Sequence, residues 1–381
     1  MINTSKLRWH DGEWSQSDTQ LESPQLVLLF GAGSNLRDKA IRASLRKRVG
    51  SATIVGCSTA GEILGGSVGD DGLVALALEF DTTTVRSAYR EIDNANESES
   101  VGEALAEDLT APGLRHVLVF SDGLKVNGTS LARGLRSKLP AEVSATGGLA
   151  GDGPRFENTT VVLDERAGSG LVAAIGLYGP DLEVHWGSAG GWSAFGPKRK
   201  VTRAKDNVLF ELDDKPALAL YKTYLGDRAE GLPSTGLLFP LELVAEDVSS
   251  TGLVRTILAV DEDKQSLTFA GDVPEGRYVR LMKASTDKLI WGAEYAVEMM
   301  AAPETKPEVA LLVSCVGRRL VLGQRVEEEV EAVATELGNP SGVVGFYSYG
   351  EIGPGGLSHG CELHNQTMTL TTLAERESSS L

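Results

Sequence analysis

Short runs of apolar residues divide this chain and predict its buried strands. Residues 26–30 (LVLLF), 117–120 (VLVF) and 309–313 (VALLV) are unbroken apolar runs of strand length. Such runs are typical of strands that are covered on both faces, because both alternating sets of side chains must then be apolar. The three runs therefore predict three buried strands, each at the start of a structural unit.

An amphipathic helix, a second strand and a glycine-containing turn are expected after each run. Apolar residues recur at near-helical spacing at positions 36, 40, 45 and 49, then 131, 135 and 139, then 326, 330, 333 and 337. Residues 55–63 (VGCSTAGEI) and 344–352 (VGFYSYGEI) match at five of nine positions, which indicates an internal repeat. The predicted fold is α/β (mixed α+β), built from repeated strand-helix-strand-strand units whose turns contain Glu62, Asp152 and Glu351.

Four segments are expected from the distribution of polar and apolar residues. The first 24 residues are polar, so the folded body is expected to begin near residue 25. A helix predicted between Pro216 and Gly226 marks a domain junction, because proline favours a helix start and glycine a helix end. The predicted segments are a polar N-terminal segment at 1–24, domains at 25–220 and 221–373, and a polar tail at 374–381.

The composition narrows the class of partner. The chain has 36 Lys and Arg against 53 Asp and Glu, a net charge of -17, which repels nucleic acid and anionic membrane surfaces. Its apolar runs are far shorter than the roughly 18 residues that cross a bilayer, and the first 20 residues lack the apolar stretch of a signal peptide. The three cysteines, Cys57, Cys315 and Cys361, have no metal-type spacing. We expect a soluble protein of the reducing cytoplasm, with no nucleic-acid partner and no membrane insertion.

Several short motifs, in order along the chain, resemble those of the FIST sensory proteins. The N-terminal half resembles the FIST N-terminal domain at residues 56–63 (GCSTAGEI) and 147–152 (GGLAGD). Several motifs in the right order are far more specific than any single one. The resemblance covers residues 25–373 and implies the two-domain FIST architecture. In the C-terminal half, which resembles the FIST C-terminal domain, the matching motifs are residues 215–217 (KPA), 224–226 (YLG), 346–354 (FYSYGEIGP) and 364–369 (HNQTMT).

The resemblance implies a role in signal transduction. FIST domains are proposed to bind small molecules such as amino acids. They occur fused to, or encoded near, histidine kinases, chemotaxis receptors and cyclic-dinucleotide enzymes. Only residues 374–381 follow the predicted last strand, so we expect this chain to signal in trans to a partner of one of these kinds. The family has no agreed set of ligand contacts, so the resemblance assigns no binding residue.

The candidate ligand-binding residues lie mostly in the repeated turns. Hydroxyls, carboxylates and aromatic rings at strand ends are the mixture typical of a small-molecule pocket. An amino acid also needs an acidic group for its ammonium and backbone amides or an arginine for its carboxylate. The predicted set is Cys57, Ser58, Thr59, Glu62, Gly148, Asp152, Arg318, Tyr347, Ser348, Tyr349 and Glu351.

Glu62 and Glu351 allow two interpretations. Paired carboxylates do acid–base work or grip a ligand amine, but each residue would equally cap backbone amides in a tight Gly-Glu turn. An enzyme hypothesis places both carboxylates in one cleft between the domains. We predict no enzyme, because no nucleophile, base and orienting residue occur in a known arrangement. Cys57 is interpreted as a small packed side chain rather than a reactive thiol.

Haem is the alternative ligand, because some FIST members are described as haem proteins that sense nitric oxide. Haem iron needs an axial ligand such as histidine, and His185 and His364 are the candidates for a noncovalent site. The sequence has no C-x-x-C-H attachment motif. No other cofactor is expected.

Overall fold

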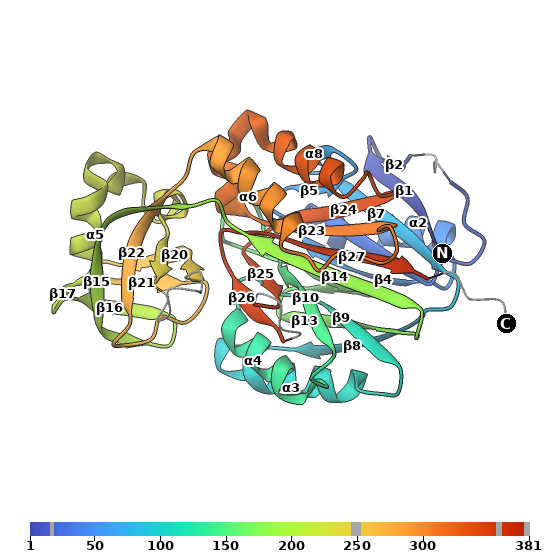
Figure 1. Ribbon diagram of the computed structural model, residues 1–381, viewed down its shortest axis with the longest axis horizontal. Helices are drawn as coiled ribbons and strands as arrows, with labels where there is room; N and C mark the ends of the chain where they lie inside the picture. Colours follow the sequence, from blue (N-terminus) through green and yellow to red (C-terminus); the bar gives the residue numbers. More distant parts are fainter. Residues whose placement is uncertain (16–18, 245–252, 356–359, 377–381) are drawn as a thin grey trace.

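The computed structural model of the chain describes residues 1–15, 19–244, 253–355 and 360–376. Figure 1 shows a large body and a smaller lobe, which lies to the left and carries α5, β15 to β17 and β20 to β22. The chain leaves the body after β14 (Leu182–Ala189) and returns to it at α6 (Thr286–Glu298). The lobe is therefore formed by one continuous segment of the chain, inserted between two parts of the body.

The body is built from one unit that occurs three times, so the predicted repeat is confirmed. Each unit has a buried first strand, a helical segment, a parallel second strand, a hairpin, and a long third strand antiparallel to the first. The first unit is β3 (Leu26–Gly31), α1 (Gly33–Arg37), α2 (Lys39–Val49), β4 (Thr53–Ser58), β5 (Glu62–Leu64), β6 (Ser67–Gly69) and β7 (Leu73–Phe80). The second is β9 (Leu114–Ser121), α4 (Gly128–Lys138), β10 (Ser144–Leu149), β11 (Val161–Leu163), β12 (Arg166–Gly168) and β13 (Leu171–Tyr178). The third is β23 (Val309–Cys315), α7 (Val316–Leu322), α8 (Val326–Glu336), β24 (Gly342–Ser348), β25 (Gly350–Gly353), β26 (Glu362–His364) and β27 (Met368–Glu375).

The three units are interlocked, because each contributes its hairpin to the sheet of another unit. Strand β5 pairs with β24, β11 pairs with β4, and β25 pairs with β10. One more strand lies beside the third strand of each unit: β1 (Ile2–His10) beside β7, β8 (Thr84–Glu91) beside β13, and β14 beside β27. Each sheet of the body thus combines strands from distant parts of the chain.

A glycine at the same place in each second strand allows the parallel strands to approach closely. A Cβ added at Gly56, Gly147 or Gly345 would lie 1.7, 1.9 or 1.9 Å from a carbonyl oxygen of the neighbouring first strand. No side chain fits at such a distance, so each position requires glycine. The three glycines mark equivalent points of the repeated unit.

The inner faces of the three sheets meet in a shared core. Phe30, Phe120 and Phe346 come from three different sheets, and their ring centroids are 4.7 to 6.2 Å apart. Alternate residues of the run 26–30 face this core, while the others face α2 on the outside. Burial on both faces explains why that run is apolar throughout. Helices α3 (Ser98–Leu109) and α4 pack with the second sheet, and α6 and α8 with the third.

The lobe has its own sheet and its own apolar core. The sheet order is β19-β18-β22-β15-β16-β21-β20, with β17 beside β16, and α5 (Ala217–Leu225) packs into the same core. Residue 220 lies in α5, inside this lobe, so the lobe extends to both sides of the domain boundary predicted near residue 220. The boundary itself stays a prediction. The strands are β15 (Ser193–Lys205), β16 (Val208–Leu212), β17 (Lys215–Pro216), β18 (Leu241–Leu243), β19 (Leu253–Arg255), β20 (Ile257–Asp261), β21 (Ser266–Phe269) and β22 (Tyr278–Lys283).

The expectation that the folded body begins near residue 25 is wrong. Strand β1 pairs with β7 from Ile2 to Trp9, and β2 (Glu13–Trp14) pairs with the end of β1. Ile2, Leu7 and Trp14 are buried. The segment reads as polar because β1 is only half buried and its other residues face outward. In the predicted tail, residues 374 and 375 belong to β27, and residues 377–381 lie outside the described part of the chain.

Helices of the described residues are all too short or too polar to span a membrane.

Candidate functional site

Each of the two predicted glutamates accepts hydrogen bonds that tie its turn to the start of the last strand of its unit, an arrangement called here a clasp. The clasp occurs in the first and third units. Glu62 Oε1 accepts the backbone N–H of Gly72 at 3.0 Å, and Glu351 Oε2 accepts that of Thr367 at 3.2 Å. Gly72 and Thr367 each precede the last strand of their unit. A hydroxyl three residues before each glutamate also donates to it, at 3.5 Å from Thr59 and 2.6 Å from Ser348. The shared geometry supports the capping interpretation of both residues.

Glu62 and Glu351 belong to different sheets and have different surroundings. Glu62 pairs with β24 in one sheet, while Glu351 pairs with Gly148 of β10 in another. Burial raises the pKa of Glu62, and Arg319 opposes this shift. Complete burial raises the pKa of Glu351 to about 8, which favours the neutral form of this carboxyl. The hydrogen bonds of the two carboxyls go to separate sets of partners, which gives no support to a shared catalytic cleft.

The predicted residues of the first turn are packed into the body. Cys57 lies in the shared core, and burial raises the pKa of its thiol well above the usual value. Ser58 Oγ accepts the backbone N–H of Thr160 at 2.9 Å. Gly148 is held between strands, and a Cβ there would lie 2.8 Å from the Val313 side chain. These positions serve packing and strand pairing, and a low-pKa nucleophilic thiolate is not formed at Cys57.

Asp152 and Tyr349 organise the long turn of the second unit. The Tyr349 hydroxyl donates to the Asp152 carboxylate, and this carboxylate accepts the backbone N–H groups of residues 156, 157 and 158 at 2.9 to 3.0 Å. The Tyr349 ring stacks on Phe156, with centroids 4.3 Å apart. Burial raises the pKa of Tyr349. The pair joins the third unit to the second.

Arg318, expected to receive a ligand carboxylate, is paired inside the protein. Arg318 and Glu329 form an ion pair at 2.6 Å, and both side chains are fully buried. Arg318 also donates to the carbonyl oxygen of Leu289 at 2.8 Å. Tyr347 and Ser314 donate to the other carboxylate oxygen of Glu329 at 3.0 and 2.8 Å. The structure thus brings Arg318 and Tyr347 together around Glu329, a partner that the sequence did not indicate.

The two histidines considered for haem have oxygen partners. His185 Nε2 lies 2.8 Å from Glu183 Oε1, and His364 Nε2 lies 3.2 Å from the Gly353 carbonyl oxygen. Burial lowers the pKa of His364. An axial ligand needs a ring nitrogen that faces the iron in an apolar slot. In each ring Nε2 is already engaged by an oxygen, so these contacts do not favour Nε2 as an axial ligand.

An apolar pocket lies in the lobe, between α5 and the lobe sheet. Its two arginines are already paired: Arg199 with Asp213 at 2.9 Å and Arg280 with Glu242 at 2.7 Å. None of the predicted site residues lines this pocket. Its walls are Phe195, Pro197, Arg199, Leu212, Leu220, Tyr221, Tyr224, Leu241, Val279, Arg280 and Leu281.

The strongest candidate site is a polar cluster where the third unit meets the lobe, called here the junction cluster. Asn365 is 1% exposed, and neither Nδ2 nor Oδ1 has a hydrogen-bond partner. The neighbouring Gln366 is fully buried; its Nε2 donates to Leu237 O of the lobe at 3.1 Å, while its Oε1 has no partner. Buried polar atoms without partners are rare in native proteins and call for an explanation. The cluster comprises Thr256, Cys315, Ser348, Glu351, Asn365, Gln366 and Thr367.

The rest of the junction cluster is neutral and enclosed. Burial, followed by the nearby Glu351 carboxyl, raises the pKa of Cys315 to about 12, and the Thr256 hydroxyl of the lobe faces this thiol. From the sequence, residues 364–369 stood out only as a family motif and, at His364, as a haem candidate, and Asn365 and Gln366 were not predicted as site residues. The consecutive polar residues Asn365 and Gln366 between two buried strands were the available signal, because a short interior loop must satisfy its own polar groups.

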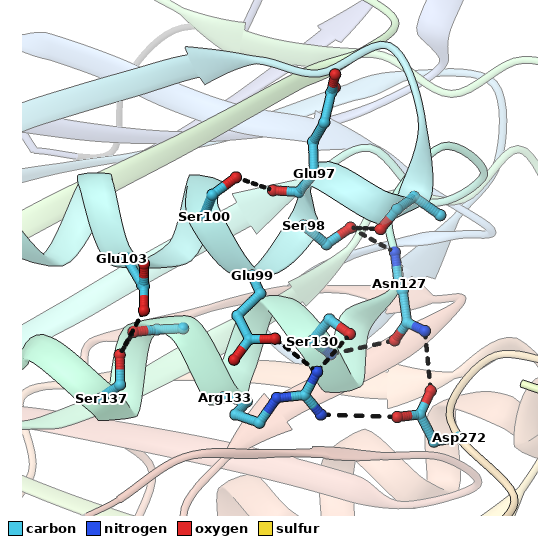
Figure 2. A network of polar contacts seen from close by, with 12 residues as sticks. Glu97, Ser98, Glu99, Ser100, Glu103, Asn127, Ser130, Arg133, Ser137 and Asp272 are labelled. Atoms are coloured by element: carbon cyan, nitrogen blue, oxygen red, sulfur yellow. Dashed lines mark hydrogen bonds and ion pairs between the residues drawn. The ribbon is translucent and has the colours of Figure 1, made fainter. Parts of the chain in front are cut away.

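The lobe contacts the body through polar groups close to this cluster. Arg255 Nη1 donates to the Leu363 carbonyl oxygen at 3.2 Å, so lobe contacts flank Asn365 on both sides. Figure 2 shows a second contact, in which Asp272 of the lobe accepts from Asn127 at 2.9 Å and lies 3.8 Å from Arg133 on α4. Arg133 also donates to Glu99 of α3 at 2.8 Å. The Asp272 contact is half-buried and the Arg255 contact is buried, so the polar contacts between lobe and body differ in their exposure.

Comparison with known families agrees with this architecture. Residues 25–215 match the FIST N domain and residues 217–354 match the FIST C domain. No curated protein matches the chain. The turns with Glu62 and Asp152 lie in the first match, and the turn with Glu351 lies in the second. The chain therefore belongs to the FIST family, whose two domains are sensory domains of signal transduction.

Proposed function

We propose that this protein is a sensor that binds a small polar ligand at the junction cluster and signals in trans to a partner protein. Membership of the FIST family supports sensing as the class of function. One observation carries the choice of site: the buried carboxamide of Asn365 has both of its polar atoms unpartnered. Burying an amide without partners costs about 1–3 kcal/mol in proteins, and a bound ligand would remove that penalty.

Movement of the lobe is part of the proposal. A side chain that is 1% exposed can receive a ligand only if its surroundings open. Lobe contacts flank Asn365 at Leu363 and Gln366, and in the described part of the chain the crossings between body and lobe come after β14 and before α6. Ligand binding would therefore change the equilibrium between lobe positions, provided that the ligand contacts both parts in only one of them.

The ligand class we propose is a small polar metabolite, with amino acids as the class that the family implies. Because Arg318 is paired with Glu329, an amino acid would have to bind through other groups of the junction cluster. We propose no catalytic role, since the hydrogen bonds of Glu62 and Glu351 are those of structural clasps. Haem is the alternative ligand, although no contact of His185 or His364 favours it; a Soret band that is lost on His364→Ala would support it.

The proposed partner is a histidine kinase, a chemotaxis receptor or a cyclic-dinucleotide enzyme. Family context supports these kinds of partner. Pull-down from native lysate with and without the ligand tests the proposal. If no partner depends on ligand under any condition, the protein is better described as a ligand carrier.

Thermal stability in the presence of candidate ligands tests the binding site. Wild-type protein is heated with single amino acids and a panel of small polar metabolites, and a ligand raises the midpoint because it binds only the folded state. Asn365→Leu should abolish the shift. Asn96→Leu is the matched control, because Asn96 is exposed and its substitution should leave the shift unchanged. A ligand that stabilises wild type and Asn365→Leu equally would contradict the proposed site.

A further inference from the structure

We infer that the ligand of the junction cluster is an uncharged molecule with a cis-amide edge, an N–H donor beside a carbonyl acceptor, that pairs with the Asn365 carboxamide. This inference rests on the proposed function and names the chemistry that the site would recognise. Asn365 supplies one acceptor oxygen and one donor nitrogen at a fixed spacing. A single ligand with the complementary pair, side by side, satisfies both atoms at once.

The pattern of unpartnered atoms supports this edge. Both ends of the Asn365 carboxamide lack partners, so either orientation of the amide leaves a donor and an acceptor to be satisfied. Asparagine uses this same geometry when it forms two parallel hydrogen bonds to an adenine edge.

The charges around the cluster favour an uncharged ligand. Burial raises the pKa of Glu351 to about 8 and that of Cys315 to about 12, and it lowers the pKa of His364, so burial favours the uncharged form of all three groups. Arg318 is paired with Glu329. The Arg255 guanidinium donates to backbone carbonyl oxygens, with Asp272 and Glu362 as its nearby negative charges. For an ammonium brought to Asn365, the acidic group of the cluster is Glu351, whose buried carboxyl already accepts hydrogen bonds from Ser348 and Thr367, and burying an unpaired charge is costly.

A matched set of three small probes tests the inference. 2-Pyrrolidinone has a cis-amide edge, N-methyl-2-pyrrolidinone lacks the N–H donor, and 4-aminobutanoate is the open-chain zwitterion of the same skeleton. Binding to the full-length protein at pH 7 is measured by ligand-detected NMR, with thermal stability as a second readout. We expect 2-pyrrolidinone to bind about tenfold or more tightly than either analogue, because each analogue leaves a buried polar atom unpaired or buries a charge.

Two variants connect the result to the site. Asn365→Leu should lose the preference for 2-pyrrolidinone, and Asn365→Asp, which keeps the shape but replaces the donor by an acceptor, should lose it as well. Asn96→Leu should behave as wild type. Equal binding of the three probes, binding of none, or a preference that survives Asn365→Leu would overturn the inference. If 4-aminobutanoate binds best in an Asn365-dependent way, the amide inference fails while the proposed sensor function stands.

Discussion

Replacing Asn365 by leucine should stabilise the ligand-free protein, which is unusual for a change at a buried polar residue. Leucine has nearly the same shape as asparagine and carries no polar atoms. In wild type both polar atoms of the side chain are buried without partners, a penalty of about 1–3 kcal/mol. Removing this penalty should raise the free energy of unfolding by about 2 kcal/mol. For a chain of 381 residues, that corresponds to a rise of roughly 2 °C in the unfolding midpoint.

Urea unfolding followed by circular dichroism measures this effect. The midpoint should rise without a change in slope, since the surface exposed on unfolding stays nearly the same. Gln366→Leu is the informative contrast: Gln366 Nε2 donates to Leu237 O, so this variant should be less stable than wild type. A loss of more than about 1 kcal/mol in Asn365→Leu would refute the reasoning, because it would show that the carboxamide is already satisfied in the free protein.

Three further predictions address the body and its charges. Arg318→Met should lower the free energy of unfolding by about 3–5 kcal/mol, because it leaves Glu329 charged and unpaired in the interior; the double variant with Glu329→Gln should recover part of this loss in urea unfolding. The pKa of Glu351 is about 8 in the folded state against 4.5 for a free side chain, so wild type should lose up to about 1.4 kcal/mol of stability per pH unit as the pH rises from 4.5 to 8. Glu351→Gln should flatten that slope, and an unchanged slope would show that Glu351 is not the titrating group. Gly56→Ala should unfold or severely destabilise the protein, since the new Cβ would lie 1.7 Å from a carbonyl oxygen, whereas Gly168→Ala has nothing within 4 Å and should differ little from wild type in thermal midpoint.

Local patterns were sufficient to predict the repeated units of the body. The run 26–30 is apolar at every position because its two faces contact the shared core and α2. Its burial on both faces can therefore be predicted from the sequence alone. Strand β1 gave no such signal, since only part of its length is buried and it includes charged residues such as Lys6 and Arg8. The exchange of hairpins between units could not be predicted from the sequence, because pairing of β5 with β24 joins residues at least 280 positions apart, such as Leu64 and Val344, without any local signal.

The candidate site was predicted only in part, because some of its contacts also leave no local signal in the sequence. The clasps of Glu62 and Glu351 follow from a turn that is visible in the sequence, so the residues were found even though their role was left open. The partner of Arg318 was not found, because Glu329 lies on α8 in a helix whose first turn holds three glutamates, and the sequence does not distinguish the buried one. Asn365 becomes notable only when its burial and its lack of hydrogen bonds are known, and both are properties of the tertiary structure.

The most direct test of the proposed sensor is the NMR signal of the Asn365 side-chain amide. Protein labelled with ¹⁵N at asparagine is titrated with amino acids, 2-pyrrolidinone and other small polar metabolites, and the signal is assigned by its absence in Asn365→Leu. A bound ligand at the junction cluster should shift this signal in a saturable way and leave that of the exposed Asn96 in place. If compounds that bind the protein leave the Asn365 signal unchanged, or if none of them binds, the proposed site is contradicted.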